Sequence, residues 1–232
     1  MSDLGHPRLH MRCTGSTNDR ARELARAGAP HGTLVTAAEQ SAGRGRHGRS
    51  WSAPPASSLL MSLVLRSPPR LLPLIAALAV CDVAGERARI KWPNDVVVIR
   101  GEGLAKLAGI LAEGRPQEGW AVLGIGLNVA VRLDDLPAEL RERAATMGLE
   151  RDALEPLLAR LLEALEHRMA QPAQDTLQAW RERDALRGRA IAWAGGRGRA
   201  AGVDGDGRLV VLLDDGARTA LDAGEVHLQA VG

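Results

Sequence analysis

Four short apolar segments follow one another between residues 89 and 129, and only short turns separate them. Pro-Asn-Asp, a glycine-rich stretch and Gly-Arg-Pro interrupt these segments, which are Arg89–Trp92, Val96–Ile99, Lys106–Glu113 and Trp120–Val129. Their length and composition predict strands. Because such short turns join antiparallel neighbours, the segments belong to one sheet. The sequence therefore predicts a central mixed, largely antiparallel sheet, which also takes in the earlier strand patterns at Thr33–Ala38 and Leu59–Leu65.

Helices are predicted on both sides of this run of strands. Ser16 is a suitable N-cap for a short helix that a glycine ends, and Leu71–Glu86 is apolar enough to be a buried helix. Apolar residues at spacings of three and four predict two later amphipathic helices, Leu149–Met169 and Thr176–Leu186. We therefore expect an α+β fold in which helices flank the sheet.

The C-terminal part of the chain has a different pattern, with short strands and close turns from about Arg187 onward. Asp-Gly turns lie between Val203 and Leu209 and between Leu213 and Thr219, and such turns are strong signals for hairpins. This pattern predicts a small β-barrel. We therefore place a domain boundary near residue 185, which divides the chain into residues 1–185 and residues 186–232.

Charge and composition exclude several classes of function. The formal charge is +2, and no basic stripe points to nucleic acid. The N-terminus lacks an apolar signal segment, and the longest apolar run contains Pro73, so we expect a soluble cytoplasmic protein that does not contact membranes. Cys13 and Cys81 lie far apart and form no metal-binding pattern. No protein-bound metal is expected.

Residues with AT-rich codons are almost absent, with no Phe or Tyr and two Lys against twenty-eight Arg. Under such a bias, the lysines and asparagines that survive mark positions where their chemistry is required. Lysine offers a compact charge that the planar fork of arginine does not reproduce. The survivors all lie within the first 130 residues, and they are Lys91, Lys106, Asn18, Asn94 and Asn128.

The loop Gly43–Gly48 matches the pattern G-x-G-x-x-G, but the residues that follow it cannot start the helix that a dinucleotide site needs. Its glycines alternate with arginines, so we expect the backbone to wrap around an anion that guanidinium groups contact. A solvated loop or an RNA-binding loop would have the same composition. The loop by itself therefore does not decide the function.

Three other motifs carry the surviving lysines and asparagines. Lys91-Trp-Pro-Asn-Asp95 lies at a turn that can direct polar groups into a cleft, where a purine or ribose could lie against the indole, although an ordinary Asx turn has the same sequence. Lys106 opens an apolar strand, where a buried ammonium group is costly unless it meets an anion. Gly124-Ile-Gly-Leu-Asn128 lets another backbone or a ligand come close to a strand.

Taken in order, these motifs resemble the biotin protein ligase family, and the resemblance covers most of the chain. The segments that carry it are Ser16-Thr-Asn18, Gln40 to Trp51, Lys91-Trp-Pro-Asn-Asp-Val96, Lys106 to Leu111, Gly124 to Val129 and, near the C-terminus, Val203 to Leu209 and Gly224-Glu-Val226. The resemblance implies a class II synthetase-like catalytic domain at residues 1–185 and an SH3-like domain at residues 186–232. It also implies an enzyme that makes biotinyl-5'-AMP from biotin and ATP, with Mg²⁺ accompanying the ATP, and transfers biotin to a lysine of a carboxylase carrier protein.

The resemblance also implies the site residues. Lys106 and Arg46 would be catalytic. The biotin pocket would be lined by Ser16, Thr17, Asn18, Gln40, Arg44, Gly45, Arg46 and Lys106. The ATP side would be formed by Trp51, Asn94, Asp95, Lys106 and Asn128. His47 stands where an arginine is common, so it is not assigned a role.

Two other functions and one further partner share some of these features. A lipoate or octanoate ligase would share the fold, but the chain lacks a Gly-Gly-Gly-Ala-Val-like loop. An RNA-binding module is disfavoured because Phe and Tyr stacking platforms are absent. Many relatives carry an N-terminal helix-turn-helix, but only fifteen residues precede Ser16, so we expect no DNA binding. The sequence leaves a homodimer open.

The assignment of Lys106 gives a direct prediction. Lys106→Arg should fold but lose most of the adenylation, by about a hundredfold or more, because the wider guanidinium cannot take the place of a compact charge at the reacting atoms. Biotin-dependent pyrophosphate exchange measures this loss. Activity close to that of the unaltered protein would show that Lys106 is not at the reaction centre.

Overall fold

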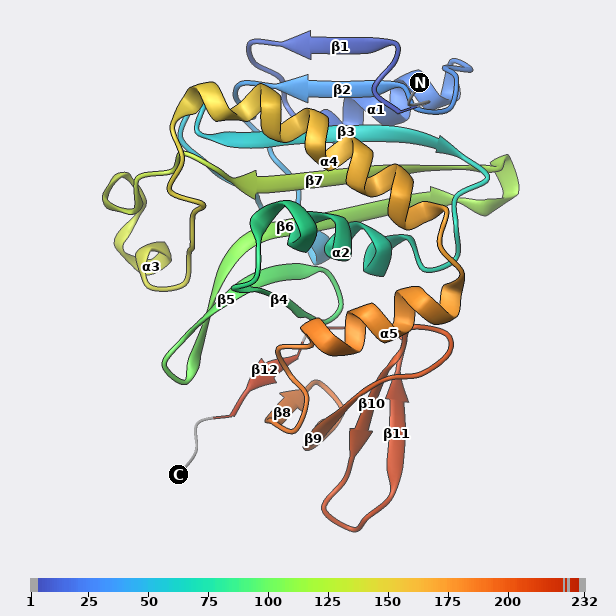
Figure 1. Cartoon of the computed structure of the whole chain (residues 1–232), viewed down its shortest axis with the longest axis vertical. Helices are drawn as coiled ribbons and strands as arrows, with labels where there is room; N and C mark the ends of the chain where they lie inside the picture. Colours follow the sequence, from blue (N-terminus) through green and yellow to red (C-terminus); the bar gives the residue numbers. More distant parts are fainter. Residues whose placement is uncertain (1–3, 223, 225, 230–232) are drawn as a thin grey trace.

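The predicted strands form the middle of a seven-stranded sheet (Figure 1). The computed structural model describes residues 4–222, 224 and 226–229. In spatial order the sheet contains β1 (Arg8–Met11), β2 (Leu34–Ala37), β3 (Ser58–Arg66), β7 (Trp120–Asn128), β6 (Gly103–Arg115), β5 (Asp95–Arg100) and β4 (Ala88–Lys91). Only the outermost pair, β1 and β2, is parallel within this sheet as described. The prediction of a mixed, largely antiparallel sheet is confirmed.

Helices cover both faces of this sheet (Figure 1). Helix α1 (Thr17–Arg26) packs on β2, β3 and β7, and its apolar stripe meets Val64 and Val122. The opposite face carries the larger core, under α2 (Leu72–Ala84), α4 (Leu154–Met169) and α5 (Ala173–Arg183). Because strand side chains alternate, Leu63 and Leu65 join this larger core while Val64 faces α1.

Three elements differ from the sequence prediction. β1 was not predicted, because its sequence, Arg-Leu-His-Met, has no run of β-formers and it pairs only at the sheet edge. Helix α4 begins at Leu154 instead of Leu149, which lies before a 3-10 turn and is 41% exposed. Helix α5 begins directly after Pro172 and ends at Arg183, about three residues earlier than predicted at both ends.

The C-terminal strands form a second sheet, and the predicted small β-domain is confirmed. It is antiparallel, in the order β11 (Arg218–Leu221), β10 (Leu209–Leu212), β9 (Gly196–Val203), β8 (Ala190–Trp193) and β12 (His227–Leu228). Both predicted hairpins are present, as β9–β10 and β10–β11. The boundary at residue 185 stays a prediction, although α5 and β8 lie on either side of it.

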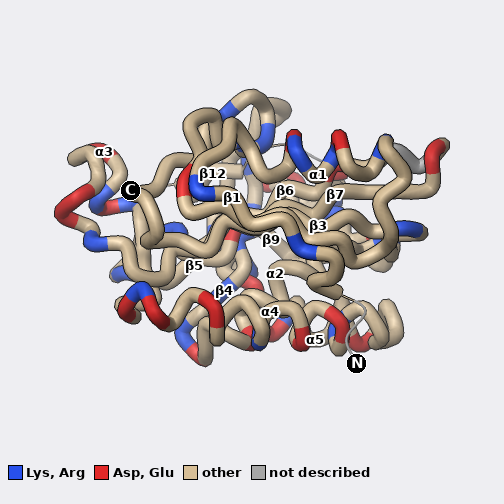
Figure 2. Tube along the Cα trace, turned by 90° about the horizontal axis from the view of Figure 1, so that it is seen from above, with Lys and Arg blue, Asp and Glu red and all other residues tan. Residues whose placement is uncertain are grey.

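Charged residues lie mainly on three of the helices, whereas α2 is almost entirely apolar (Figure 2). Basic and acidic positions are interspersed along α1, α4 and α5 (Figure 2). Within the described part of the chain, no helix combines the length and the apolar character that crossing a membrane requires.

A buried hydrogen bond and a partly buried carboxylate lie near the junction between the two sheets. The Trp92 indole donates a hydrogen bond to the Gly207 carbonyl oxygen over 3.0 Å, which ties the second domain to the end of β4. Asp184 follows α5 and accepts a hydrogen bond from the Leu186 backbone, but its second carboxylate oxygen is buried without a partner. Burial raises the pKa of Asp184 from its ordinary 3.8 to about 6, against the opposing effect of the backbone donors at residues 186 and 187.

This shift predicts the pH dependence of stability at the junction. A raised pKa means that the folded state prefers the protonated acid, so the contribution of Asp184 is greatest below pH 3.8 and is lost as the pH rises through about 6. The stability of Asp184→Asn relative to the unaltered protein should therefore rise by about 3 kcal/mol between acid and neutral pH. Urea unfolding of both proteins across this range measures the difference. A constant difference would show that Asp184 does not titrate in this way.

Candidate active site

A pocket lies on the face of the sheet that α1 covers only partly, beneath the loop of residues 43–50, which we call the Gly/Arg loop. Of the predicted site residues, all but Asn128 line it, namely Ser16, Thr17, Asn18, Gln40, Arg44, Gly45, Arg46, Trp51, Asn94, Asp95 and Lys106. They come from α1, the loop, the turn between β4 and β5, and β6. The tertiary structure thus brings together residues that span ninety positions of the sequence.

Three glycines, which we call the glycine floor, form the base of this pocket: Gly109 of β6, and Gly124 and Gly126 of β7. A Cβ atom at Gly126 would lie 2.6 Å from the Trp51 indole, and one at Gly124 would lie 2.0 Å from Asn18 Oδ1. Larger residues would occupy the space that these side chains fill. The glycines therefore let Trp51 and Asn18 lie directly against the sheet.

The Gly/Arg loop is an ordered hairpin over the glycine floor. Arg44 and Ser50 form an antiparallel bridge, and a 3-10 turn at Arg46–Gly48 closes the hairpin. His47 has the left-handed backbone conformation, with φ 53°. At the base of the hairpin, a Cβ atom on Gly43 would lie 2.3 Å from the Trp51 carbonyl oxygen, so glycine is needed there.

One end of the pocket holds neutral polar groups in a fixed network. Gln40 Oε1 accepts hydrogen bonds from the Thr17 amide at 2.7 Å and the Thr17 hydroxyl at 3.0 Å. The Ser62 hydroxyl lies 2.6 Å from Asn18 Oδ1 and 2.8 Å from Thr17 Oγ1. Ser16, Thr17 and Asn18 are all buried. This end therefore presents preorganised donors and acceptors to a neutral polar ligand group.

Lys106 marks the other end of the pocket, and its position depends on a β-bulge. The register of β5 against β6 shifts so that Leu107 is the extra residue, which turns Lys106 and Gly109 toward the same face. The ammonium group lies 2.8 Å from Asp95 Oδ1 and 5.6 Å from the centre of the Trp51 ring. The expectation that Lys106 is buried is wrong, because its side chain is 40% exposed.

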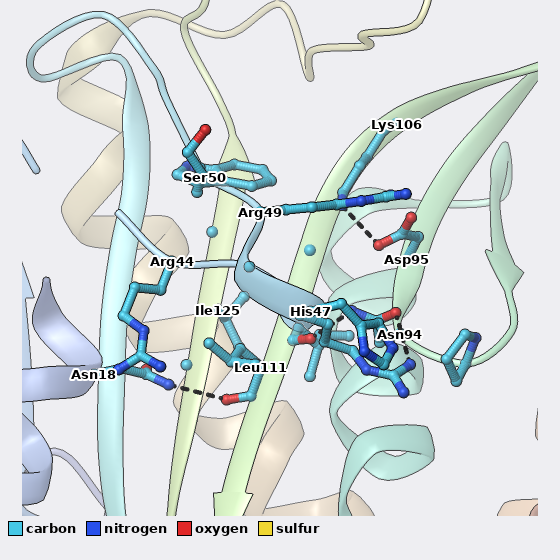
Figure 3. A pocket seen from close by; sticks show the side chains of 18 of the residues that line it. Asn18, Arg44, His47, Arg49, Ser50, Asn94, Asp95, Lys106, Leu111 and Ile125 are labelled. Atoms are coloured by element: carbon cyan, nitrogen blue, oxygen red, sulfur yellow. Dashed lines mark hydrogen bonds and ion pairs between the residues drawn. The ribbon is translucent and has the colours of Figure 1, made fainter. Parts of the chain in front are cut away.

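Cations exceed carboxylates around this pocket. Among the residues that the structure describes, its lining includes five cationic side chains, Arg44, Arg46, Arg49, Lys91 and Lys106, and one carboxylate, that of Asp95. Figure 3 shows two groups within this set: Arg44 lies beside Asn18, whereas Arg49 and Lys106 lie beside Asp95 at the opposite side of the loop. An excess of positive charge around a confined cavity favours an anionic ligand.

The Lys91–Asp95 turn supplies the wall between the two ends. Asn94 Nδ2 donates to the Ile110 carbonyl oxygen at 2.7 Å, and Asn94 Oδ1 lies 3.4 Å from Arg46. The expectation that a purine or ribose lies against the Trp92 indole is not supported. Trp92 is 2% exposed and packs in the larger core. Its indole donates a hydrogen bond to the second domain and is not open to a ligand.

Asn128 lines a second cavity of about 770 Å³, which adjoins the first through Trp51, Lys91, Asp95 and Lys106. Its amide is already engaged, since Nδ2 donates to the Ala145 carbonyl oxygen at 2.9 Å and Ser58 donates to Oδ1 at 3.3 Å. The cavity is of a size that holds nucleotide-sized ligands. Among residues 4–222, 224 and 226–229, no cluster of three or more His, Cys, Asp or Glu suits a metal ion.

Sequence reasoning missed several residues of this region. Arg49 and Lys91 line the pocket, and both lay inside motifs that had been recognised. Ser62 lies in the middle of β3, where the other residues from Leu59 to Leu65 are all apolar, and this break in the pattern could have singled it out. Glu113, which binds Asn18 from β6 at 2.8 Å, had no distinguishing signal.

Together, the fold and the pocket define a two-domain α+β protein with a cation-rich pocket over a glycine floor. The sequence profile of the Biotin/lipoate A/B protein ligase family matches residues 10–129, and that of the Biotin protein ligase C terminal domain matches residues 196–228. The chain therefore belongs to the biotin/lipoate protein ligase family, as its motifs indicated.

Individual relatives agree with this membership. The chain is 37% identical to the Biotin--[acetyl-CoA-carboxylase] ligase of Mycobacterium tuberculosis over 93% of its length and 87% of that protein's length. It is 39% identical to the Bifunctional ligase/repressor BirA of Bacillus spizizenii over 62% of its length, but that match spans only 47% of the relative. The fold is similar to that of the biotin protein ligase from Aquifex aeolicus in complex with biotin and ATP, with TM-score 0.78 at 24% identity, covering 97% of this chain and 100% of that one.

The glycine floor gives a prediction about Trp51, which was expected on the ATP side. Gly126→Ala should fold, because alanine is tolerated in a strand, but its methyl group must displace the indole. The KM for ATP should rise about tenfold or more, and adenylation kinetics would measure it. Gly205→Ala, whose methyl group meets open space, is the control. An unchanged KM would remove Trp51 from the nucleotide site.

Proposed function

We propose that the protein is a biotin protein ligase that joins biotin and ATP to form biotinyl-5'-AMP and then transfers biotin to a lysine of a carrier protein. The observation that carries the proposal is the pocket itself: a neutral polar end and a cationic end lie over one glycine floor. Membership of the family and the Mycobacterium tuberculosis relative, which is named for this activity, support it. A biotin molecule has the same polarity, with a neutral ureido ring and a carboxylate.

The neutral end of the pocket suits the ureido ring. Ser16 and Thr17 begin α1 at this end, and Gln40 fixes Thr17 through two hydrogen bonds. Because these groups are buried and already oriented, little conformational freedom is lost when a ligand binds. The valeryl chain of biotin would then extend over the glycine floor toward Lys106.

The cationic end suits the reacting groups. In the first step a biotin carboxylate oxygen attacks the α-phosphorus of ATP, the bond to the β-phosphate bridging oxygen breaks, and pyrophosphate leaves. This step brings two anions together, so Arg46 and Lys106 would offset the charge that accumulates in the transition state. Lys106 is already held against Asp95, so its charge is placed before the ligand arrives.

ATP fits the larger adjoining cavity, next to Trp51 and Asp95. Mg²⁺ would come with ATP as part of that substrate. Asp95 is the one carboxylate in the pocket lining as described, with the Asn94 amide oxygen next in sequence. This small set of oxygen donors fits an ion held mainly by phosphate. Asn128 would act by holding the segment at Ala145, since its amide is engaged there.

In the second step the amine of a carrier lysine attacks the acyl carbon of the mixed anhydride, a proton is lost from the nitrogen, and AMP leaves. The chain's two lysines, Lys91 and Lys106, both line the pocket, so the acceptor lysine comes from another protein. We propose a carboxylase carrier domain as that protein, from the name of the relative. A cytoplasmic location stays a prediction from the sequence.

A lipoate ligase is the second candidate, since the matched family contains both kinds of enzyme. The separate match of residues 196–228 to the biotin protein ligase C-terminal domain favours biotin. The neutral hydrogen-bonding end of the pocket points the same way, because the dithiolane ring of lipoate makes no comparable hydrogen bonds.

ATP-dependent transfer of biotin to a purified carrier domain tests the proposal. We expect biotin on the carrier by streptavidin blot together with pyrophosphate release, and no transfer when lipoate replaces biotin. Pyrophosphate release without transfer would mean that the acceptor is a different protein. If the folded protein gives neither product, the proposed function is wrong.

A further inference from the structure

A charged cluster lies directly behind the neutral end of the pocket. Asp19 and Arg22 of α1 form one ion pair, and Arg22 also lies 3.1 Å from Glu113 of β6. Neither Asp19, Arg22 nor Glu113 lines the pocket. The second carboxylate oxygen of Glu113 accepts a hydrogen bond from Asn18 Nδ2 at 2.8 Å. The cluster is therefore attached to the pocket wall but is not part of it.

Arg44 of the Gly/Arg loop completes this cluster. Its guanidinium lies 2.7 Å from Asp19 and 3.4 Å from Glu113, away from Lys106 and Asp95 (Figure 3). Asp19, and after it Glu113, raises the pKa of the Arg44 guanidinium above its usual value. Two carboxylates and two guanidinium groups thus balance each other. Arg44 was expected to contact the ligand, but these contacts engage its guanidinium with the protein.

We infer that Asp19 and Glu113 are positioning residues, which hold the Gly/Arg loop closed over the bound ligand through Arg44. If the loop opened, Arg44 would leave with it, and two carboxylates would remain near the single charge of Arg22. That repulsion disfavours the open loop. The inference rests on the proposed function only for the identity of the ligand.

Glu113 also connects loop closure with the shape of the pocket. One of its oxygens lies by Arg44 and Arg22, and the other holds Asn18. Glu113, Leu111 and Gly109 alternate on β6, so they share the face of the sheet on which the pocket lies. A closed loop and a correctly placed Asn18 therefore depend on the same carboxylate. While the loop is closed, the ligand and the reactive anhydride should therefore escape only slowly from the pocket.

Limited trypsin digestion of the unliganded protein tests the closure without any activity. Cleavage after Arg46 and Arg49, followed by mass spectrometry, reports how often the loop opens. The variant with both Asp19→Asn and Glu113→Gln should be cut about tenfold faster than the unaltered protein, which corresponds to losing about 1.4 kcal/mol of closure. Arg44→Gln should be cut at a similar rate.

The combination of all three substitutions decides whether one interaction is involved. Because they would remove the same contacts, the triple variant should be cut no faster than Arg44→Gln. Raising the salt from about 0.05 to about 0.5 M should speed cleavage of the unaltered protein but not of Arg44→Gln. Glu23→Gln is the matched control, since it removes an exposed carboxylate from the same helix and should change nothing.

A second measurement follows the ligand. The variant with Asp19→Asn and Glu113→Gln should release biotinyl-5'-AMP about tenfold faster and show a higher KM for biotin, with the KM for ATP unchanged. A general loss of structure would alter both KM values. Thermal unfolding checks the fold, and if this variant is unfolded, Arg44→Gln alone carries the test, because its change lies on the surface loop.

Several outcomes would overturn the inference. Cleavage of the carboxylate variant at the normal rate would show that the cluster does not hold the loop. Additive effects in the triple variant would show that Arg44 acts separately, for example on the ligand. If the unaltered protein neither binds biotin nor makes the adenylate, the proposed function fails, while the digestion results still decide whether Asp19 and Glu113 close the loop.

Discussion

The pocket depends on three glycines at the centre of the main sheet, because glycine has no side chain to fill the space above the strands. Where β6 and β7 pair through Gly109 and Gly126, and at Gly124 two residues earlier, the face of the sheet carries no Cβ atom. Trp51 and Asn18 come close enough to the backbone that any substituent would meet them. Had these positions carried apolar side chains like the rest of β7, α1 and the loop would have packed on a closed surface, as α1 does beside Val122.

Charge is arranged around this gap in two groups with different partners. Lys106 and Asp95 pair inside the pocket, where the ammonium group is half exposed and can meet a ligand. Arg44 turns the other way, into the carboxylates of Asp19 and Glu113. The guanidinium groups of Arg44 and Arg46 thus have different surroundings, since Arg44 lies on one arm of the hairpin and Arg46 lies in the 3-10 turn that closes it.

Much of this arrangement was predictable from local patterns. The strands from Leu59 to Asn128 and the buried helix at α2 follow from apolar runs and turns, whose physical causes are local. Most of the predicted site residues line one pocket, because the surviving lysines and asparagines lay in recognisable motifs. β1 was missed, since a short edge strand needs no apolar alternation. The start of α4 was misjudged because Leu149 has an apolar side chain but packs outside the helix.

The sequence by itself determined the α+β class, the two kinds of sheet and the family, because strand periodicity, turn chemistry and motif order are written in neighbouring residues. Only the tertiary structure decided the direction of individual side chains. It buried Trp92 beneath the second domain, exposed Lys106 through the bulge at Leu107, and paired the Arg44 guanidinium at the pocket's edge with Asp19 and Glu113. The physical reason is that each of these outcomes depends on a partner on another element: Gly207 for Trp92, Val97 on the neighbouring strand for Lys106, and Asp19 for Arg44. No local pattern encodes such a partner, since its effect exists only once the segments have packed together.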